Sequence, residues 1–146
     1  MIPIGILGVG HLAELMVRGL SGSGYRLILS PRNAGVAARL AEEHGCEVAT
    51  SNQAVVDAAE GVFVCLPAAT GAEELSQLTF RPGQPVLSAM AGTGLARLQS
   101  VIGPARAAVT MMPGYANAYG GGPSILCPEH GCWRVFLSKT GRVHVF

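Results

Sequence analysis

The residues with the clearest chemical potential form a short glycine pattern near the start of the chain. Residues 8–13 read Gly-Val-Gly-His-Leu-Ala, which matches the pattern G-x-G-x-x-G/A. An apolar run over residues 2–9 leads into the pattern, and residues 11–20 follow with helical spacing of their apolar side chains. A strand, a glycine turn and a helix in this order are typical of a phosphate-binding turn, so the sequence predicts a dinucleotide site.

Each small residue of the pattern has its own physical role. Gly8 permits the tight turn, Gly10 lets the backbone approach the pyrophosphate, and Ala13 is small enough for the helix to pack on the strand. The free N–H groups and the positive end of the helix would hold the phosphates. His11 has two open interpretations, which are contact with the pyrophosphate and simple coverage of the helix start.

The end of the second predicted strand indicates which dinucleotide is bound. A site for NAD places Asp or Glu about 20 residues after the glycines, where the carboxylate takes the ribose hydroxyls. This chain instead has Ser30-Pro31-Arg32-Asn33, with no acid. A hydroxyl, a guanidinium and an amide are suited to a 2′-phosphate. We therefore expect NADP(H) rather than NAD, the alternative being that Ser30 caps a helix and Arg32 is solvated.

The ends of later predicted strands should line the same crevice. They read Leu66-Pro67, Ala91-Gly92 and Met112-Pro113, all small or apolar and suited to lie against a nicotinamide ring. None is an acid or a base, but a reductase does not need one there, because the cofactor carries the hydride chemistry. We name no catalytic residue.

One group of cysteines and a histidine resembles a metal site only superficially. Cys127, His130 and Cys132 lie close in sequence, but their spacing is not that of a zinc knuckle and no second ligand pair follows. We expect no metal, and we interpret this segment as the end of a strand and the start of a helix.

Composition limits the classes of function. The chain has 146 residues, a net charge of +1, 49% hydrophobic residues and only 13% charged residues. Such a charge favours neither nucleic acid nor an anionic membrane. The few charges suggest apolar surface that another domain or subunit covers. The first positive side chain is Arg18, and no apolar stretch is long enough to span a bilayer, so we expect a soluble, cytoplasmic protein.

Strand-like and helix-like segments alternate along the chain. Expected strands cover residues 2–9, 25–30, 46–49, 61–66, 85–90, 107–112, 124–127 and 142–146, and expected helices cover 11–20, 34–44, 52–59, 72–78, 94–101 and 132–139. This alternation predicts an α/β fold, a doubly wound parallel sheet with helices on both faces. We expect one dinucleotide-binding (Rossmann) domain over residues 1–146.

Several of these segments, in this order, resemble pyrroline-5-carboxylate reductase. The similar segments are residues 4–14, 18–20, 30–33, 51–55, 62–67, 88–92 and 112–113, spread over nearly the whole chain. The wider relatives include deazaflavin-dependent NADP reductases and β-hydroxyacid-type dehydrogenases. The resemblance implies an NADPH-dependent enzyme of proline biosynthesis that reduces a cyclic imine. It also implies a helical, dimerising C-terminal domain, which is absent here because the chain ends about where that domain begins.

The resemblance also assigns cofactor contacts by position. It puts Gly8, Gly10, His11, Leu12 and Ala13 at the pyrophosphate, Ser30, Arg32, Asn33 and Asn52 at the adenosine phosphate, and Leu66, Pro67, Ala91, Gly92, Met112 and Pro113 beside the nicotinamide. The sequence departs from the family at His11, usually Asn, at Leu66, usually Lys, and after Pro113, where Asn is usual. The last two leave a different substrate open. A cofactor-binding module without turnover is the other alternative.

Overall fold

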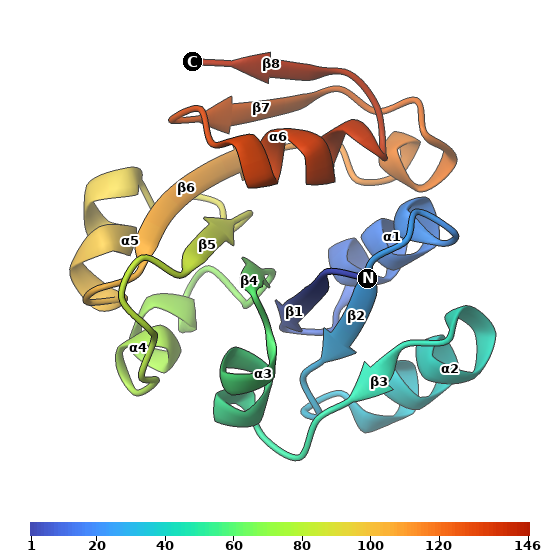
Figure 1. Cartoon of the computed structure of the whole chain (residues 1–146), viewed down its shortest axis with the longest axis horizontal. Helices are drawn as coiled ribbons and strands as arrows, with labels where there is room; N and C mark the ends of the chain where they lie inside the picture. Colours follow the sequence, from blue (N-terminus) through green and yellow to red (C-terminus); the bar gives the residue numbers. More distant parts are fainter.

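Strands and helices alternate along the whole chain in the computed structural model, which describes all residues 1–146 (Figure 1). The strands are β1 (Pro3–Leu7), β2 (Arg26–Leu29), β3 (Glu47–Val48), β4 (Gly61–Val64), β5 (Pro85–Ser88), β6 (Arg106–Met111), β7 (Ser124–Cys127) and β8 (Val143–Val145). The helices are α1 (His11–Leu20), α2 (Ala34–His44), α3 (Asn52–Ala58), α4 (Gly71–Ser76), α5 (Leu95–Val101) and α6 (Gly131–Ser138), with a 3₁₀ turn, η1 (Ala116–Tyr119).

All strands join one sheet in the order β3-β2-β1-β4-β5-β6-β7-β8. The strands from β1 to β6 are parallel, which confirms the doubly wound α/β fold. The order reverses between β1 and β4, so the carboxyl ends of these two strands flank the crevice where such sheets bind ligands.

The far end of the sheet departs from the fully parallel arrangement that we expected. β7 pairs antiparallel with β6, and β8 is parallel to β7, so both run against the other strands. The connection from β6 to β7 contains only the short turn η1 and no helix that crosses the sheet. A parallel return needs a crossover connection, usually a helix, whereas an antiparallel return does not.

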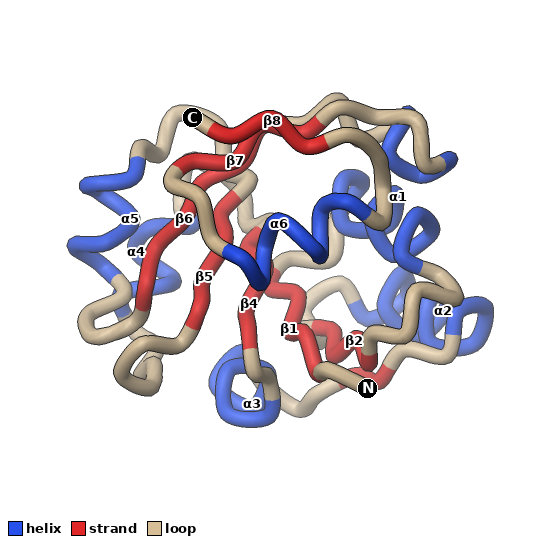
Figure 2. The backbone as a smooth tube through the Cα atoms, turned by 45° about the horizontal axis from the view of Figure 1, so that its top comes forward, coloured by secondary structure: helices blue, strands red, loops and turns tan.

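Helices cover the two faces of the sheet (Figure 2), and a hydrophobic cluster lies on each face. On one face α1, α2 and α6 pack through side chains that include Met16, Leu40 and Phe136. On the other face α3, α4 and α5 pack through side chains that include Val55, Leu75 and Leu98. Successive residues of the strands enter opposite layers, as the two-residue period of a strand requires.

Local signals set several element ends. The Ser51 hydroxyl accepts a hydrogen bond from the N–H of Ala54 and caps α3. Gly45 ends α2 in the left-handed conformation. Gly94 is the N-cap residue of α5, and no side chain caps this helix. No helix is both long and apolar enough to span a membrane.

Candidate cofactor-binding site

The glycine pattern forms a tight turn between β1 and α1. Gly8 has a φ of 86°, and a Cβ added there would lie 2.7 Å from the carbonyl oxygen of Cys65 at the end of β4. Only glycine fits this combination of backbone conformation and close approach. The glycine turn therefore packs directly against the end of β4.

Gly10 has the opposite surroundings. It is the N-cap residue of α1, no side chain caps the helix there, and a Cβ added to Gly10 would meet nothing within 4 Å. The first N–H groups of α1 thus have no side-chain cap, and they lie beside open space at the positive end of a ten-residue helix. A phosphate group fits this arrangement, and a side chain at Gly10 would occupy its space.

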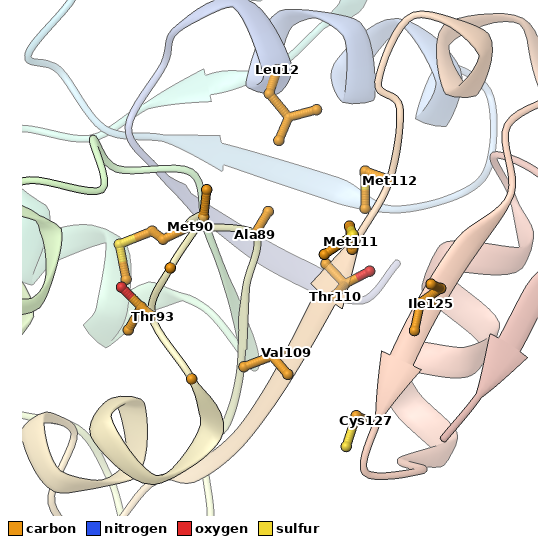
Figure 3. A pocket seen from close by; sticks show the side chains of 13 residues that line it. Leu12, Ala89, Met90, Thr93, Val109, Thr110, Met111, Met112, Ile125 and Cys127 are labelled. Atoms are coloured by element: carbon orange, nitrogen blue, oxygen red, sulfur yellow. The ribbon is translucent and has the colours of Figure 1, made fainter.

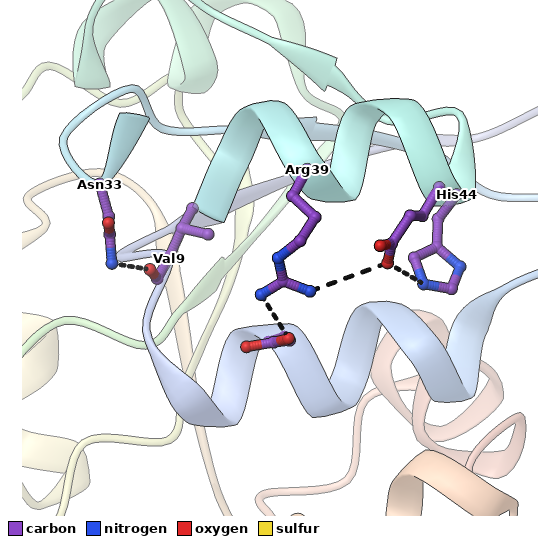
Figure 4. Close-up of polar contacts among 6 residues, drawn as sticks. Val9, Asn33, Arg39 and His44 are labelled. Atoms are coloured by element: carbon purple, nitrogen blue, oxygen red, sulfur yellow. Dashed lines mark hydrogen bonds and ion pairs between the residues drawn. The ribbon is translucent and has the colours of Figure 1, made fainter. Parts of the chain in front are cut away.

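Two polar side chains from the segment after β2 hold the glycine turn in place. The buried Ser30 hydroxyl accepts a hydrogen bond from the N–H of Gly8 at 2.9 Å. The Asn33 amide donates to the carbonyl oxygen of Val9 at 3.0 Å, as Figure 4 shows. Both residues were predicted to contact the cofactor. In this structure Ser30 and the amide nitrogen of Asn33 support the turn, and their contact with a phosphate stays a prediction.

A cavity of about 200 Å³ opens beside the turn. Its walls are the turn itself, the end of β4 and the segment after β2, with Gly8, Val9, Gly10, Arg32, Asn33, Cys65, Leu66 and Pro67 as lining residues. Burial raises the pKa of the Cys65 thiol far above its usual value, so the thiol stays neutral and does not repel an anion. The structure thus places Arg32 and the glycine turn in one cavity, and their contact with a cofactor stays a prediction.

Arg32 is the exposed cation of this cavity, and it has one anionic partner. Its guanidinium forms an ion pair with the carboxylate of Glu74 on α4. The side chain of Arg32 is 67% exposed, so the guanidinium remains accessible to a ligand. Sequence reasoning missed Glu74, because this residue lies 42 positions after Arg32 and nothing in the sequence of α4 indicates the contact.

A second, larger cavity of about 550 Å³ lies at the carboxyl ends of β5 and β6. It contains three of the predicted nicotinamide neighbours, Ala91, Gly92 and Met112, together with Leu12 from α1. Figure 3 shows side chains from α1, β6, β7 and the segment after β5 around it. The lining is mostly apolar and holds no carboxylate, histidine or lysine. It can sequester a flat ring from water, and its one ionisable side chain is the Cys127 thiol.

Several residues that line this apolar cavity were not among the cofactor contacts predicted from the sequence. They are Ala89, Met90, Thr93, Gly94, Val109, Thr110, Met111, Ile125 and Cys127. The first seven residues in this list lie in β6 or in the segment that follows β5, so the predicted strands there could have indicated them. Ile125 and Cys127 belong to β7, whose antiparallel place beside β6 the sequence did not reveal.

The remaining predicted contacts lie at different places. Leu66 and Pro67 line the cavity beside the glycine turn, called the phosphate cavity below, and not the apolar cavity. Pro113 lies in an adjoining groove of about 460 Å³ that also includes Phe146. Asn52 begins α3, outside the residues that line either main cavity. His11 is exposed at the first position of α1, and the buried Ala13 packs in the core.

A buried asparagine fixes the loop behind the apolar cavity. The Asn117 side chain, fully buried in η1, accepts a hydrogen bond from the N–H of Gly114 at 3.0 Å. Its amide donates to the hydroxyls of Ser124 and Thr140 at 3.3 and 3.2 Å. These contacts tie the end of β6 to β7 and to the segment after α6. They therefore anchor the loop that follows Met112.

Similar solved structures agree with this fold. Pyrroline-5-carboxylate reductase from Streptococcus pyogenes superposes with a TM-score of 0.86 at 23% identity, over 99% of this chain and 58% of its own. The Plasmodium falciparum pyrroline carboxylate reductase with NADP bound gives 0.81 at 12% identity, over 99% and 57%. An Aspergillus terreus imine reductase in complex with NADPH4 gives 0.82 at 18% identity, over 100% and 55%. The chain thus spans a little over half the length of these proteins.

Sequence comparison identifies the family. No curated protein matches the chain at the sequence level. A family model described as NADP oxidoreductase, coenzyme F420-dependent, matches residues 3–92, which is more than half of the chain and includes the glycine turn, Arg32 and the end of β5. This match confirms the prediction of an NADP-dependent oxidoreductase domain. The chain belongs to the family of coenzyme F420-dependent NADP oxidoreductases.

Proposed function

We propose that this chain is the cofactor-binding domain of a reductase that transfers hydride from NADPH to a small cyclic imine of the pyrroline-5-carboxylate type. One observation carries the proposal. An apolar cavity without a carboxylate, histidine or lysine lies at the carboxyl edge of the sheet, next to a glycine turn that fits a pyrophosphate. The superposed pyrroline-5-carboxylate and imine reductases support the choice of substrate class.

In this proposal each of the two cavities binds a different part of the cofactor. The first N–H groups of α1 and the open space at Gly10 bind the pyrophosphate. The Arg32 guanidinium binds the 2′-phosphate, for which its planar fork of donors is suited. Ser30 and Asn33 orient the turn from behind. Asn52, at the start of α3, is the least supported of the proposed contacts, because neither main cavity includes it.

The apolar cavity serves the reacting end of the cofactor. Leu12, Ala91 and Met112 exclude water from one side of the nicotinamide, and bound NADPH supplies the hydride. We propose that the proton for the reduced nitrogen comes from elsewhere, because no carboxylate, histidine, lysine or tyrosine lines this cavity. We propose that residues 1–146 form one domain, and that a second, helical domain or a partner subunit in a homodimer completes the substrate site. The whole enzyme would then act in proline biosynthesis, in the cytoplasm.

A second candidate acceptor follows from the family itself. The matching family is described as coenzyme F420-dependent, and a planar deazaflavin is suited to a broad apolar cavity of about 550 Å³. In this alternative, hydride passes between NADP(H) and the deazaflavin, and no imine is reduced.

A turnover assay separates these candidates. The chain, and the chain supplemented with the helical domain of a pyrroline-5-carboxylate reductase, would be incubated with NADPH and either 1-pyrroline-5-carboxylate or oxidised F420. The absorbance of the reduced nicotinamide reports the transfer. Oxidation of NADPH with the pyrroline alone supports the proposal. Oxidation with F420 alone replaces it with the second candidate, and tight NADPH binding without oxidation in any mixture favours a binding module.

A further inference from the structure

Glu74 is the one carboxylate that reaches the cation of the phosphate cavity. Arg32 lies on the wall that follows β2, whereas Glu74 belongs to α4, the helix that follows the opposite wall at the end of β4. Their ion pair therefore connects the two walls of the cavity. The other carboxylate oxygen of Glu74 lies 3.4 Å from the hydroxyl of Thr70, which helps to hold the carboxylate toward the cavity.

The two charges are unequally exposed. The Glu74 side chain is 22% exposed and that of Arg32 is 67% exposed, so the acid is the more buried partner and the arginine is the more accessible to a ligand. A 2′-phosphate that binds the Arg32 guanidinium must displace Glu74 or share the cation with it. Either way the carboxylate opposes the phosphate, because two anions then compete for one fork of donors.

We propose that Glu74 is a specificity-determining residue that competes with the 2′-phosphate for Arg32 and so reduces the preference for NADPH over NADH. This inference rests on the proposed role of Arg32 in NADP binding. Glu74 lines neither the phosphate cavity nor the apolar cavity, and it reaches the phosphate cavity only through its ion pair with Arg32. Its effect should therefore be confined to the nucleotide that carries the extra phosphate.

The test is a calorimetric titration of the chain with NADPH and with NADH, in the wild type and in Glu74→Gln. An exposed ion pair contributes about 0.2–1 kcal/mol, so its removal should tighten NADPH binding up to about fivefold and leave NADH unchanged. Glu73→Gln is the matched control, because Glu73 lies on the same helix, is exposed and forms no ion pair. In an Arg32→Ala background, Glu74→Gln should have no effect on NADPH binding.

Other outcomes overturn the inference in distinguishable ways. If the wild type binds NADPH and Glu74→Gln leaves its affinity unchanged, or changes both nucleotides equally, Glu74 does not compete and the proposed function stands. Weaker NADH binding in Glu74→Gln would place this carboxylate on the ribose hydroxyls instead. If the folded wild type binds neither nucleotide, the proposed function fails and the inference fails with it.

Discussion

Substitution of Gly10 by valine should abolish dinucleotide binding and leave the fold intact, whereas substitution of Gly8 by alanine should destabilise the fold. A Cβ at Gly10 meets no atom within 4 Å, and the residue has extended backbone, so valine fits the unliganded chain. At Gly8, φ is 86° and the added Cβ lies 2.7 Å from the Cys65 carbonyl oxygen. The two glycines therefore separate binding from stability.

The magnitudes follow from these surroundings. A side chain at Gly10 would occupy the phosphate space and break about two charge-assisted hydrogen bonds, each worth about 1.5–3 kcal/mol. NADPH affinity should then fall by a factor of about 100 or more. A strained left-handed residue costs about 1–3 kcal/mol, so Gly8→Ala should lower the Tm by about 3–10 °C.

Calorimetry with NADPH and a thermal melt followed by circular dichroism measure the two effects on the same samples. Gly35→Val, at a helical glycine with open space around an added Cβ, is a control for valine in place of an exposed glycine. Unchanged NADPH affinity in a folded Gly10→Val would refute the assignment of the pyrophosphate to this turn. An unchanged Tm in Gly8→Ala would refute the argument from backbone strain.

Three further substitutions test the surroundings of the site. Arg32→Ala should weaken NADPH by about 1.5–3 kcal/mol and spare NADH in the same titrations, and equal losses would contradict its role at the phosphate. Asn117→Ala removes three buried hydrogen bonds and should lower the free energy of unfolding, measured in urea, by about 2–4 kcal/mol. A loss under about 0.5 kcal/mol, which is typical of surface substitutions, would contradict a structural role for this network. Burial, with Arg106 nearby, lowers the pKa of His130 below 6.5. Below pH 6.5 the folded chain therefore binds fewer protons than the unfolded chain, and its stability falls as the pH decreases. His130→Gln should reduce this loss in urea titrations at successive pH values, and an identical pH dependence would argue against it.

The parallel core of the fold was predictable because its signals are local. The helix limits His11–Leu20 and Ala34–His44 agree with the expected residues, since apolar spacing and flanking glycines determine them. The direction of β7 was not predictable in this way. Alternating strands and helices predict parallel strands, and only the length and packing of the loop around η1 decide that β7 returns antiparallel.

The same distinction applies to the candidate site. The glycine turn and Arg32 could be found from sequence, because a short motif and its distance to the next strand carry the signal. The supporting hydrogen bonds of Ser30 and Asn33 could not, because their donors and acceptors become neighbours only when β1 and β2 pair. Glu74 and the β7 wall of the apolar cavity depend on contacts between distant segments.

The central claim is that the cavity beside the glycine turn binds NADP(H) and recognises its 2′-phosphate. The most direct test is to titrate the wild-type chain with NADPH and with NADH by calorimetry at matched ionic strength, because salt screens the phosphate contact. The account predicts saturable binding of both, with NADPH tighter by about tenfold or more, the equivalent of one charge-assisted contact of about 1.5 kcal/mol. Equal or tighter binding of NADH, or no binding of either by the folded chain, would contradict it.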